Sequence, residues 1–178
     1  MMSIEQYETN RLILRPFKEA DIERLAEIAN DYDIARQTSK LPYPLKQEDV
    51  AGLFEEIRND IAYAIIYEGE LVGSISARSI TDDEAELSYW LGKAWWKMGI
   101  ASEAVTFFIT HLFQHHDFTR LQASRAKDNP GSGRVLEKVG FKNIGPVLYY
   151  SRARDEDVPC WTYRLLKADW QSGNGEVL

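Results

Sequence analysis

Residues 89–104 join an apolar strand, a basic turn that contains Gly99, and an amphipathic helix in direct succession. The first turn of a helix exposes backbone N–H groups and the positive end of the helix dipole, and a glycine there lets a ligand approach the main chain closely. This layout therefore predicts a binding site for phosphate. An ordinary strand-to-helix connection, with Lys93 and Lys97 simply exposed to water, is the alternative that the stretch leaves open.

The composition fits one folded domain with a substantial core. The chain has 178 residues, of which 44% are hydrophobic and 12% are aromatic. Its 28 acidic and 21 basic residues give a formal net charge of -7, the wrong sign for a protein that binds nucleic acid by counterion release. We therefore expect no nucleic-acid partner, and a polyanionic ligand has to be held by a local basic cluster.

Few residues of this chain suit a metal site. Cys160 is the single cysteine, so neither an intrachain disulfide nor a cysteine-rich zinc site can form, and we expect it to be a small buried apolar residue. His111, His115 and His116 lie close together in the sequence but lack the neighbouring glutamate of the H-E-x-x-H motif. We therefore expect no metal.

The beginning of the chain, residues 1–8, has neither a basic region nor an apolar core. No later run of apolar residues approaches the length that crosses a membrane. We therefore expect a soluble cytoplasmic protein without a membrane partner.

The first sixty or so residues are typical of a strand followed by two helices. Residues 11–15 are β-prone and end at Pro16, and apolar side chains recur at helical spacing from about Glu19. Residues 41–45 include two prolines and predict a rigid aromatic loop, because proline restricts itself and its predecessor. A second helix then ends near Asn59.

The rest of the chain alternates between strands and helices. Residues 62–67 and 71–78 predict an antiparallel hairpin, and residues 84–91 predict a strand with an apolar and a polar face. The further expected elements are a helix after Gly99, a strand over 121–126, a helix capped by Asn129 and ended by Gly140, strands around 147–154 and 160–166, and a frayed tail over 171–178. We expect a single domain over residues 1–170.

Five motifs stand in a characteristic order, namely residues 9–15, Glu86–Leu91, Gly99–Ala104, Asn129–Ser132 and Val135–Phe141. With the order of elements, they resemble the GNAT family of N-acetyltransferases over nearly the whole chain. The chain is most similar to the RimJ/RimL branch, which acetylates the N-termini of ribosomal proteins. The resemblance implies an α+β (α/β) fold in one domain, with a mixed, mostly antiparallel seven-stranded sheet flanked by about four helices.

The phosphate turn departs from the family pattern at its start. The family commonly has Gln or Arg first and often Gly next, whereas this chain has Trp96 and Lys97 and keeps Gly99 and Ala101 as matches. Trp is tolerable at the first position because backbone N–H groups bind the phosphates. Compared with glycine at this position, Lys97 restricts the backbone but adds a positive charge. We therefore expect the turn to bind the acyl donor.

The resemblance implies acetyl-CoA as the cosubstrate. Its pyrophosphate would lie on the first turn of the central helix, and its pantetheine arm would lie beside the strand that ends at Leu91. Asn129 bonds the pantetheine amides or merely caps its helix, and Lys138 reaches the phosphates or is simply solvated. The expected donor-binding residues are Tyr89, Trp90, Leu91, Trp96, Lys97, Met98, Gly99, Ile100, Ala101, Ser102, Asn129, Ser132 and Lys138.

The resemblance also implies direct attack of a primary amine on the thioester, through a tetrahedral intermediate. The amine must be neutral, and Glu86 is the candidate base because it lies on the polar face of the strand that carries the donor. A solvated carboxylate, as for Glu84, is the alternative. Ser132 is the candidate acid for the departing thiolate, since a helix N-terminus favours negative charge; it is otherwise simply a good first-turn residue.

The acceptor would be a protein N-terminal amine or a small-molecule amine. By analogy with the family, its walls would be the loop around Tyr43 and the closing strands with Tyr149, Tyr150 and Trp161. A catalytically inactive sensor that binds CoA is the alternative to an enzyme. Both a monomer and a homodimer remain open.

Overall fold

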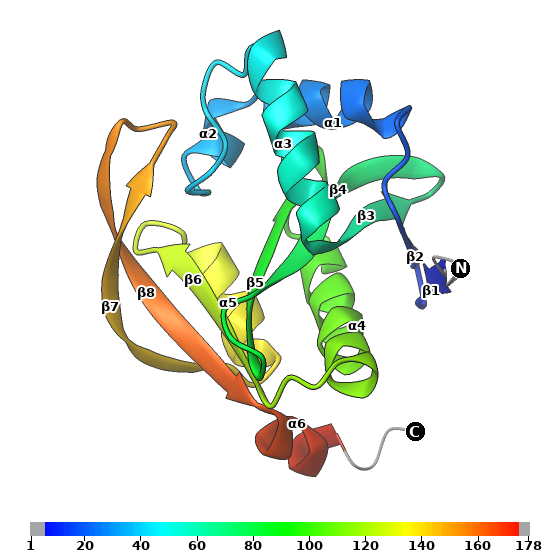
Figure 1. The fold of residues 1–178 in the computed structure, drawn as a ribbon, viewed down its shortest axis with the longest axis vertical. Coiled ribbons are helices and arrows are strands. Elements are labelled where there is room, and N and C mark those ends of the chain that lie inside the picture. Colours follow the sequence, from blue (N-terminus) through cyan, green and yellow to red (C-terminus); the bar gives the residue numbers. More distant parts are fainter. Residues whose placement is uncertain (1–5, 175–178) are drawn as a thin grey trace.

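The computed structural model describes residues 6–174, whose strands form one mixed sheet (Figure 1). Within these residues the sheet has eight strands in the order β1-β2-β3-β4-β5-β6-β8-β7. Only the neighbours β5 and β6 pair in parallel, which confirms the predicted mixed and mostly antiparallel sheet. The strands are β1 (Tyr7–Glu8), β2 (Leu12–Arg15), β3 (Ile61–Tyr67), β4 (Glu70–Ser79), β5 (Glu84–Leu91), β6 (Arg120–Ala126), β7 (Lys142–Ser151) and β8 (Glu156–Leu166).

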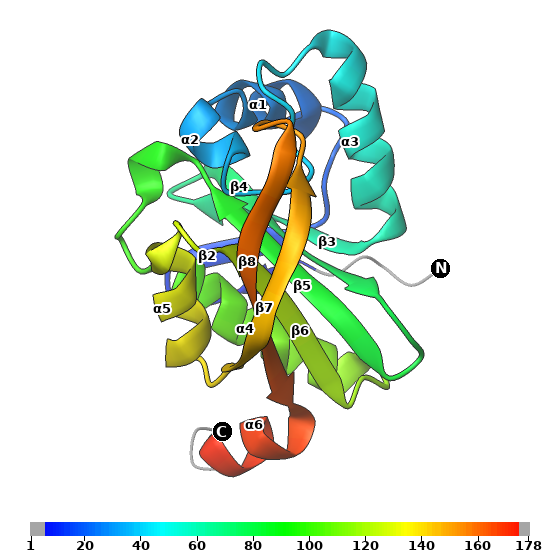
Figure 2. The same ribbon diagram turned by 90° about the vertical axis from the view of Figure 1, so that its left-hand side faces the viewer.

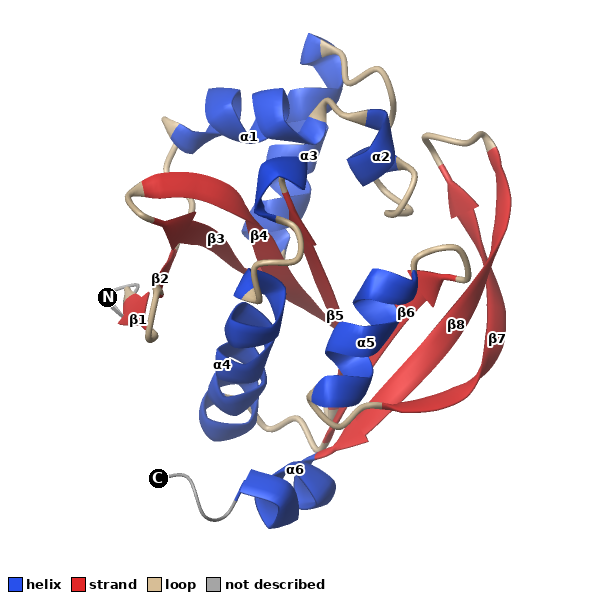
Figure 3. Ribbon diagram, turned by 180° about the vertical axis from the view of Figure 1, so that it is seen from behind, coloured by secondary structure: helices blue, strands red, loops and turns tan. Residues whose placement is uncertain are grey.

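Helices lie on both faces of the sheet. In the view from behind, α4 and α5 cover one face, whereas α1 and α3 lie over β3 and β4 on the other (Figures 1 and 3). In the described part of the chain the helices are α1 (Asp21–Ala29), α2 (Tyr32–Ala35), α3 (Gln47–Asn59), α4 (Ile100–His115), α5 (Pro130–Lys138) and α6 (Lys167–Asn174), and a short 3-10 turn (Lys93–Trp95) precedes α4. Within residues 6–174, no helix is both long enough and apolar enough to cross a membrane.

The α+β fold in one mixed sheet is confirmed, and residues 6–174 contain eight strands and six helices where the sequence predicts seven and about four, because β1, α2 and α6 were not expected. β1 and α2 span only 2 and 4 residues, too few to show a strand or helix period. α2 begins where the Asp31 side chain accepts a hydrogen bond from the backbone N–H of Asp33 at 2.8 Å. α6 continues to Asn174, where the sequence predicts a frayed tail from Gln171; residues 175–178 of that tail lie outside the described residues.

The closing hairpin is longer than the sequence predicts. β7 begins at Lys142 rather than near Val147, and β8 begins at Glu156 rather than near Cys160. Pro146 makes the early part of β7 look unlike a strand, but proline is tolerated on an edge strand, and β7 is the last strand of the sheet.

The core fixes the start of α4 against the sheet. Ile100, Ala104 and Phe108 are 0% exposed and belong to a cluster that includes Leu87 of β5 and Leu121 of β6. Ile100 is the first residue of α4, so packing anchors the turn that precedes it. Burial of such apolar side chains is the main contribution to folding stability.

β5 and β6 separate partway along their length. Their pairing runs from Glu84 and Arg120 to Glu86 and Gln122, although β5 continues to Leu91. Beyond Glu86 the two halves of the sheet therefore diverge and leave the edge of β5 open. The β7–β8 hairpin stands across this opening, with its tip beside α2 (Figure 2).

Candidate active site

A cleft of about 730 Å³ occupies the opening between β5 and β6. The first turns of α4 and α5 form one end, and residues 36–41, β4 and β7 form the other. The expected donor and acceptor ends thus belong to one cavity. The predicted residues that line it are Glu86, Tyr89, Trp90, Leu91, Trp96, Lys97, Gly99, Ile100, Ala101, Ser102, Asn129, Ser132 and Lys138.

Four residues that the sequence assigns to the site are outside the lining of this cleft, namely Met98, Tyr43, Tyr150 and Trp161. Met98 is 41% exposed and does not contribute to the lining. Side chains alternate along a strand, so Tyr150 points away from the cleft that its neighbour Tyr149 lines. Of the three expected aromatic residues on the closing strands, Tyr149 alone reaches the cavity.

The turn before α4 adopts the backbone shape that an anion site requires. Gly99 has a φ of 78°, in the left-handed region that glycine adopts readily, and it is the N-cap of α4. Lys97 also has a positive φ, of 65°, which is costly for a residue with a Cβ. This conformation explains why the family often has glycine at the position of Lys97. The N–H groups that follow Gly99 are free of intrahelical partners, as at any helix start.

Arg11 and Glu103 brace this turn, and sequence reasoning missed both roles. Arg11 donates from Nη1 to the Met98 carbonyl at 3.0 Å and from Nε to Glu103 at 2.8 Å. Thr9 donates to the same carboxylate at 2.6 Å. Burial tends to raise the pKa of Glu103, but the hydrogen bonds from Thr9 and Arg11 outweigh it and hold that pKa below its usual range. Both residues lie in recognised motifs, yet no local pattern indicates that they meet.

Tyr89 and Ser132 meet in the middle of the cleft. Their hydroxyl oxygens are 2.9 Å apart, and the backbone N–H of Ser132 donates to Asn129 Oδ1 at 3.2 Å. Asn129 therefore caps α5, as the sequence predicts. Burial raises the pKa of Tyr89 to about 12, so its hydroxyl is neutral near pH 7. Either hydroxyl of this pair can donate to the other, and Tyr89 also donates to the Ser132 carbonyl at 3.3 Å.

Glu86 projects into the cleft from β5 and contacts β7. Tyr149 donates a hydrogen bond from its hydroxyl to Glu86 Oε1 at 3.3 Å. Burial is the main cause that raises the pKa of Tyr149, which keeps it a donor. Glu84 differs, because it is 7% exposed and pairs with Arg120 at 3.1 Å. The two carboxylates of β5 therefore occupy different environments.

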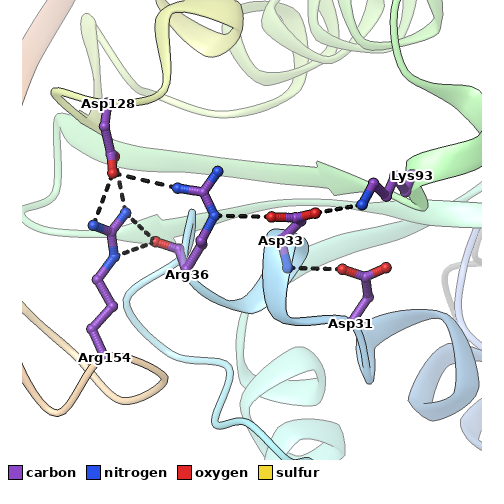
Figure 4. A network of polar contacts seen from close by, with 6 residues as sticks. All are labelled: Asp31, Asp33, Arg36, Lys93, Asp128 and Arg154. Carbon is purple, nitrogen blue, oxygen red and sulfur yellow. Dashed lines mark hydrogen bonds and ion pairs between the residues drawn. The ribbon is translucent and has the colours of Figure 1, made fainter.

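A network of ion pairs joins four segments around the cleft (Figure 4). Asp128, before α5, pairs with Arg154 of the β7–β8 turn at 2.9 Å and with Arg36, after α2, at 3.4 Å. Arg36 also pairs with Asp33 at 3.1 Å, and Asp33 contacts Lys93 of the 3-10 turn. The hydrogen bond from Arg154 is the main cause that lowers the pKa of Asp128. Sequence reasoning missed this network, because its members are far apart along the chain.

The chain matches known acetyltransferases. The sequence model described as "Acetyltransferase (GNAT) domain" matches residues 11–142. The uncharacterized N-acetyltransferase p20 of Bacillus licheniformis is 26% identical over 180 residues, which cover 94% of this chain and 99% of p20. The putative ribosomal N-acetyltransferase YdaF of Bacillus subtilis is 30% identical over 118 residues, which cover 64% of this chain and 63% of YdaF.

Solved structures share the fold. RimL, a ribosomal alpha-N-protein acetyltransferase solved in complex with coenzyme A, has a TM-score of 0.79 and 20% identity, covering 91% of this chain and 98% of RimL. At this identity the likeness concerns the fold alone. The family match, however, spans residues 11–142 of the 178-residue chain. The protein therefore belongs to the GNAT family and is an acyl-CoA-dependent N-acetyltransferase.

Proposed function

We propose that the protein transfers the acetyl group of acetyl-CoA to a primary amine, by direct attack through a tetrahedral intermediate. The observation that carries this proposal is that one cleft joins the N-terminal turn of α4, the Tyr89–Ser132 pair and Glu86. Direct acetyl transfer needs a binding site for the phosphates of the donor, a proton donor and a proton acceptor, and this one cavity holds candidates for all three. The name of RimL, a ribosomal alpha-N-protein acetyltransferase, supports the amine of a protein N-terminus as the acceptor, and a small-molecule amine is the other candidate.

The donor end of the cleft suits the acyl-CoA. The N–H groups after Gly99 would hold the pyrophosphate, and Lys97 and Lys138 of the same lining supply positive charge in a chain of net charge -7. The open edge of β5 beyond Glu86 leaves main-chain groups near Tyr89 for the pantetheine arm. One of these N–H groups would stabilise the oxyanion of the intermediate.

Glu86 would take the proton of the attacking amine, directly or through water. An ammonium group cannot attack, so an acceptor for its proton is required beside the thioester. Glu86 lines the cleft, and the hydrogen bond from Tyr149 orients its carboxylate. This contact supports the role of a positioned base.

Ser132 would return a proton to the departing thiolate. Its hydroxyl lies in the first turn of α5, where the helix dipole favours negative charge. Tyr89 Oη, at 2.9 Å, stays protonated near pH 7 and would donate a hydrogen bond to Ser132 Oγ as the serine gives up its proton. The two hydroxyls would then act as one relay.

Thiol release from acetyl-CoA, measured across a panel of amines and peptides, tests the proposal. We expect release that depends on a primary amine and yields the N-acetylated product by mass spectrometry. Tight CoA binding without release from any acceptor would reject the enzyme mechanism and support a CoA-binding sensor instead.

A further inference from the structure

Asp60 lies at the acceptor end of the cleft and was not recognised from the sequence. Its side chain is 9% exposed and lines the same cavity as Glu86. Arg78 of β4 is the strand partner of Glu86, and Arg78 Nε lies 3.4 Å from Asp60 Oδ1. Asp60 therefore stands two strands from Glu86, or about 10 Å between backbones at the usual strand spacing. A small molecule can span that separation.

The negative charge of Asp60 is poorly compensated. Its ion pairs within residues 6–174 are with Arg78 at 3.4 Å and Lys40 at 4.0 Å, whereas charge-assisted hydrogen bonds measure about 2.7–2.9 Å. The side chains of Arg78 and Lys40 are 50% and 40% exposed, so water weakens both pairs. Burial first, and then Glu56 and Glu86, raise the pKa of Asp60 to about 6. A cation in the cleft would offset these effects.

Ser151 provides a second and independent polar group at this end. It is 3% exposed and lines the cleft, and its Oγ has no hydrogen-bond partner among the described residues. Ser151 lies two positions after Tyr149, whose hydroxyl reaches Glu86, so both side chains project from the same side of β7. A buried hydroxyl without a partner is unfavourable, and an N–H donor on a ligand would satisfy it.

The acceptor end is also enclosed. The backbone N–H of Arg152, in the β7–β8 turn, donates to the Ser39 carbonyl at 3.2 Å, and Arg154 donates to the Arg36 carbonyl at 2.9 Å. These bonds tie the hairpin tip to the loop that follows α2, and Arg36 and Ser39 of that loop line the same cleft as Asp60 and Ser151. A compact acceptor fits such an enclosure better than the terminus of a folded protein.

We propose that the acceptor is a small amine with a second ammonium group, which Asp60 binds while the first amine reacts beside Glu86. The proposal rests on the proposed acetyl transfer and names its substrate class. The reacting ammonium loses one proton to Glu86, and the neutral nitrogen forms the new bond to the acetyl carbon. The nitrogen then releases its second proton, the carbon–sulfur bond of the thioester breaks, and the thiolate takes up a proton from Ser132 to leave as the CoA thiol. The second ammonium keeps its proton and its ion pair with Asp60.

Rates of thiol release with alkane diamines and with monoamines of equal length test this assignment. We expect the wild-type protein to favour the best diamine at least about tenfold in kcat/KM, because a buried ion pair is lost with the monoamine. In Asp60→Asn that ratio should fall towards one. Asp117→Asn removes the same charge from an exposed site outside the cleft and should preserve the ratio.

Equal rates with diamines and monoamines, a preference that persists in Asp60→Asn, or a preference for peptides over all diamines would each overturn the inference. Absence of thiol release from every acceptor is a different result, because it rejects the acetyl transfer itself. Calorimetric binding of the best diamine to the CoA-loaded protein then decides: equal affinity in wild type and Asp60→Asn would show that Asp60 binds no ammonium group.

Discussion

Two glutamates of one strand show how strongly position decides the role of a residue. Glu84 and Glu86 are on the same face of β5, because side chains alternate along a strand. Glu84 lies where β5 and β6 still pair, and Arg120 and Arg164 contact it at 3.1 and 3.5 Å. Glu86 lies where the strands begin to part, and it therefore lines the cleft. Because the pairing of β5 with β6 ends at Glu86, Glu84 forms an internal ion pair, whereas Glu86 faces the cleft as a candidate base.

Glu86→Gln should lower kcat by about 100-fold near pH 7, because the amide cannot accept the proton of the amine. The loss should be largest at low pH, where more of the free amine is protonated. A pH–rate profile of thiol release measures both effects. Glu55→Gln, on the exposed side of α3, is the matched control and should leave the profile unchanged. A profile of Glu86→Gln that parallels the wild type would rule out the base.

Ser132→Ala and Tyr89→Phe should each lower kcat by about tenfold, because each change breaks the hydroxyl pair that supplies the proton. The kcat of the double variant should be little lower than that of either single variant, since each single change already breaks the relay. Initial rates of the four proteins, at saturating acetyl-CoA, give the coupling between the two positions. Fully multiplicative losses would show that the hydroxyls act separately.

Gly99→Asp should weaken CoA binding by at least about tenfold. A side chain at a φ of 78° is strained, its Cβ would lie 3.3 Å from Arg11 Nη2, and its charge would repel phosphate. Titration calorimetry with CoA measures the change. Gly69→Asp is a suitable control, because Gly69 has a φ of 82° in the β3–β4 turn, outside the cleft. Retained CoA affinity in Gly99→Asp would mean that the phosphates bind elsewhere.

The sequence predicts a helix or strand well where the residues that mark its ends lie close to it in the chain. α5 was expected from a cap and an ending glycine, and Asn129 does accept the hydrogen bond from Ser132, while Gly140 has a φ of 97°. Both signals lie within a few residues of the helix end that they define. The short α2 was missed because a single turn carries no helical period.

The donor half of the candidate site is equally local, since a turn and two helix starts form most of it. The acceptor half is not, because Asp60 lies just before β3 while Glu86 and Ser151 lie on β5 and β7, and the sequence leaves the register of these strands open. The same holds for the brace of the phosphate turn, where Arg11 and Glu103 are 92 residues apart. Such contacts depend on the whole packing of the sheet and not on a nearby pattern.

Arg11→Ala should raise the KM for acetyl-CoA by about tenfold with a smaller change in kcat. Arg11 contacts the Met98 carbonyl and Glu103, so its loss would loosen the turn before α4 and leave Glu86 and Ser132 in place. Initial rates over a range of acetyl-CoA concentrations measure the two parameters. Arg24→Ala, which breaks an exposed ion pair within α1, should change neither. A loss in kcat alone would show that Arg11 does not act through donor binding.

At the scale of the whole molecule, the C-terminal end of α4 carries a buried histidine, His111, with the rings of His115 and His116 beside it. His111 is 6% exposed there, with Tyr63 Oη 3.4 Å from its Nε2 and the His115 ring 4.8 Å away. Its Nδ1 has no hydrogen-bond partner among residues 6–174. Burial first, and then His115 and His116, lower the pKa of His111 to about 4. The folded protein therefore holds this ring neutral at pH values where an unfolded chain would protonate it.

The stability of the whole fold should consequently depend on pH through His111. Its pKa is about 4 when folded and about 6.5 when unfolded, so between these values the unfolded chain binds more protons. The free energy of unfolding should therefore fall as the pH drops from 6.5 to 4, by up to about 3 kcal/mol from this group, and no further below pH 4. Urea unfolding at several pH values measures the effect. In His111→Leu the decline across this window should be smaller by that amount, whereas His115→Gln, which removes a smaller cause than burial, should keep most of it. Parallel pH dependence in His111→Leu and the wild type would mean that other groups cause the loss.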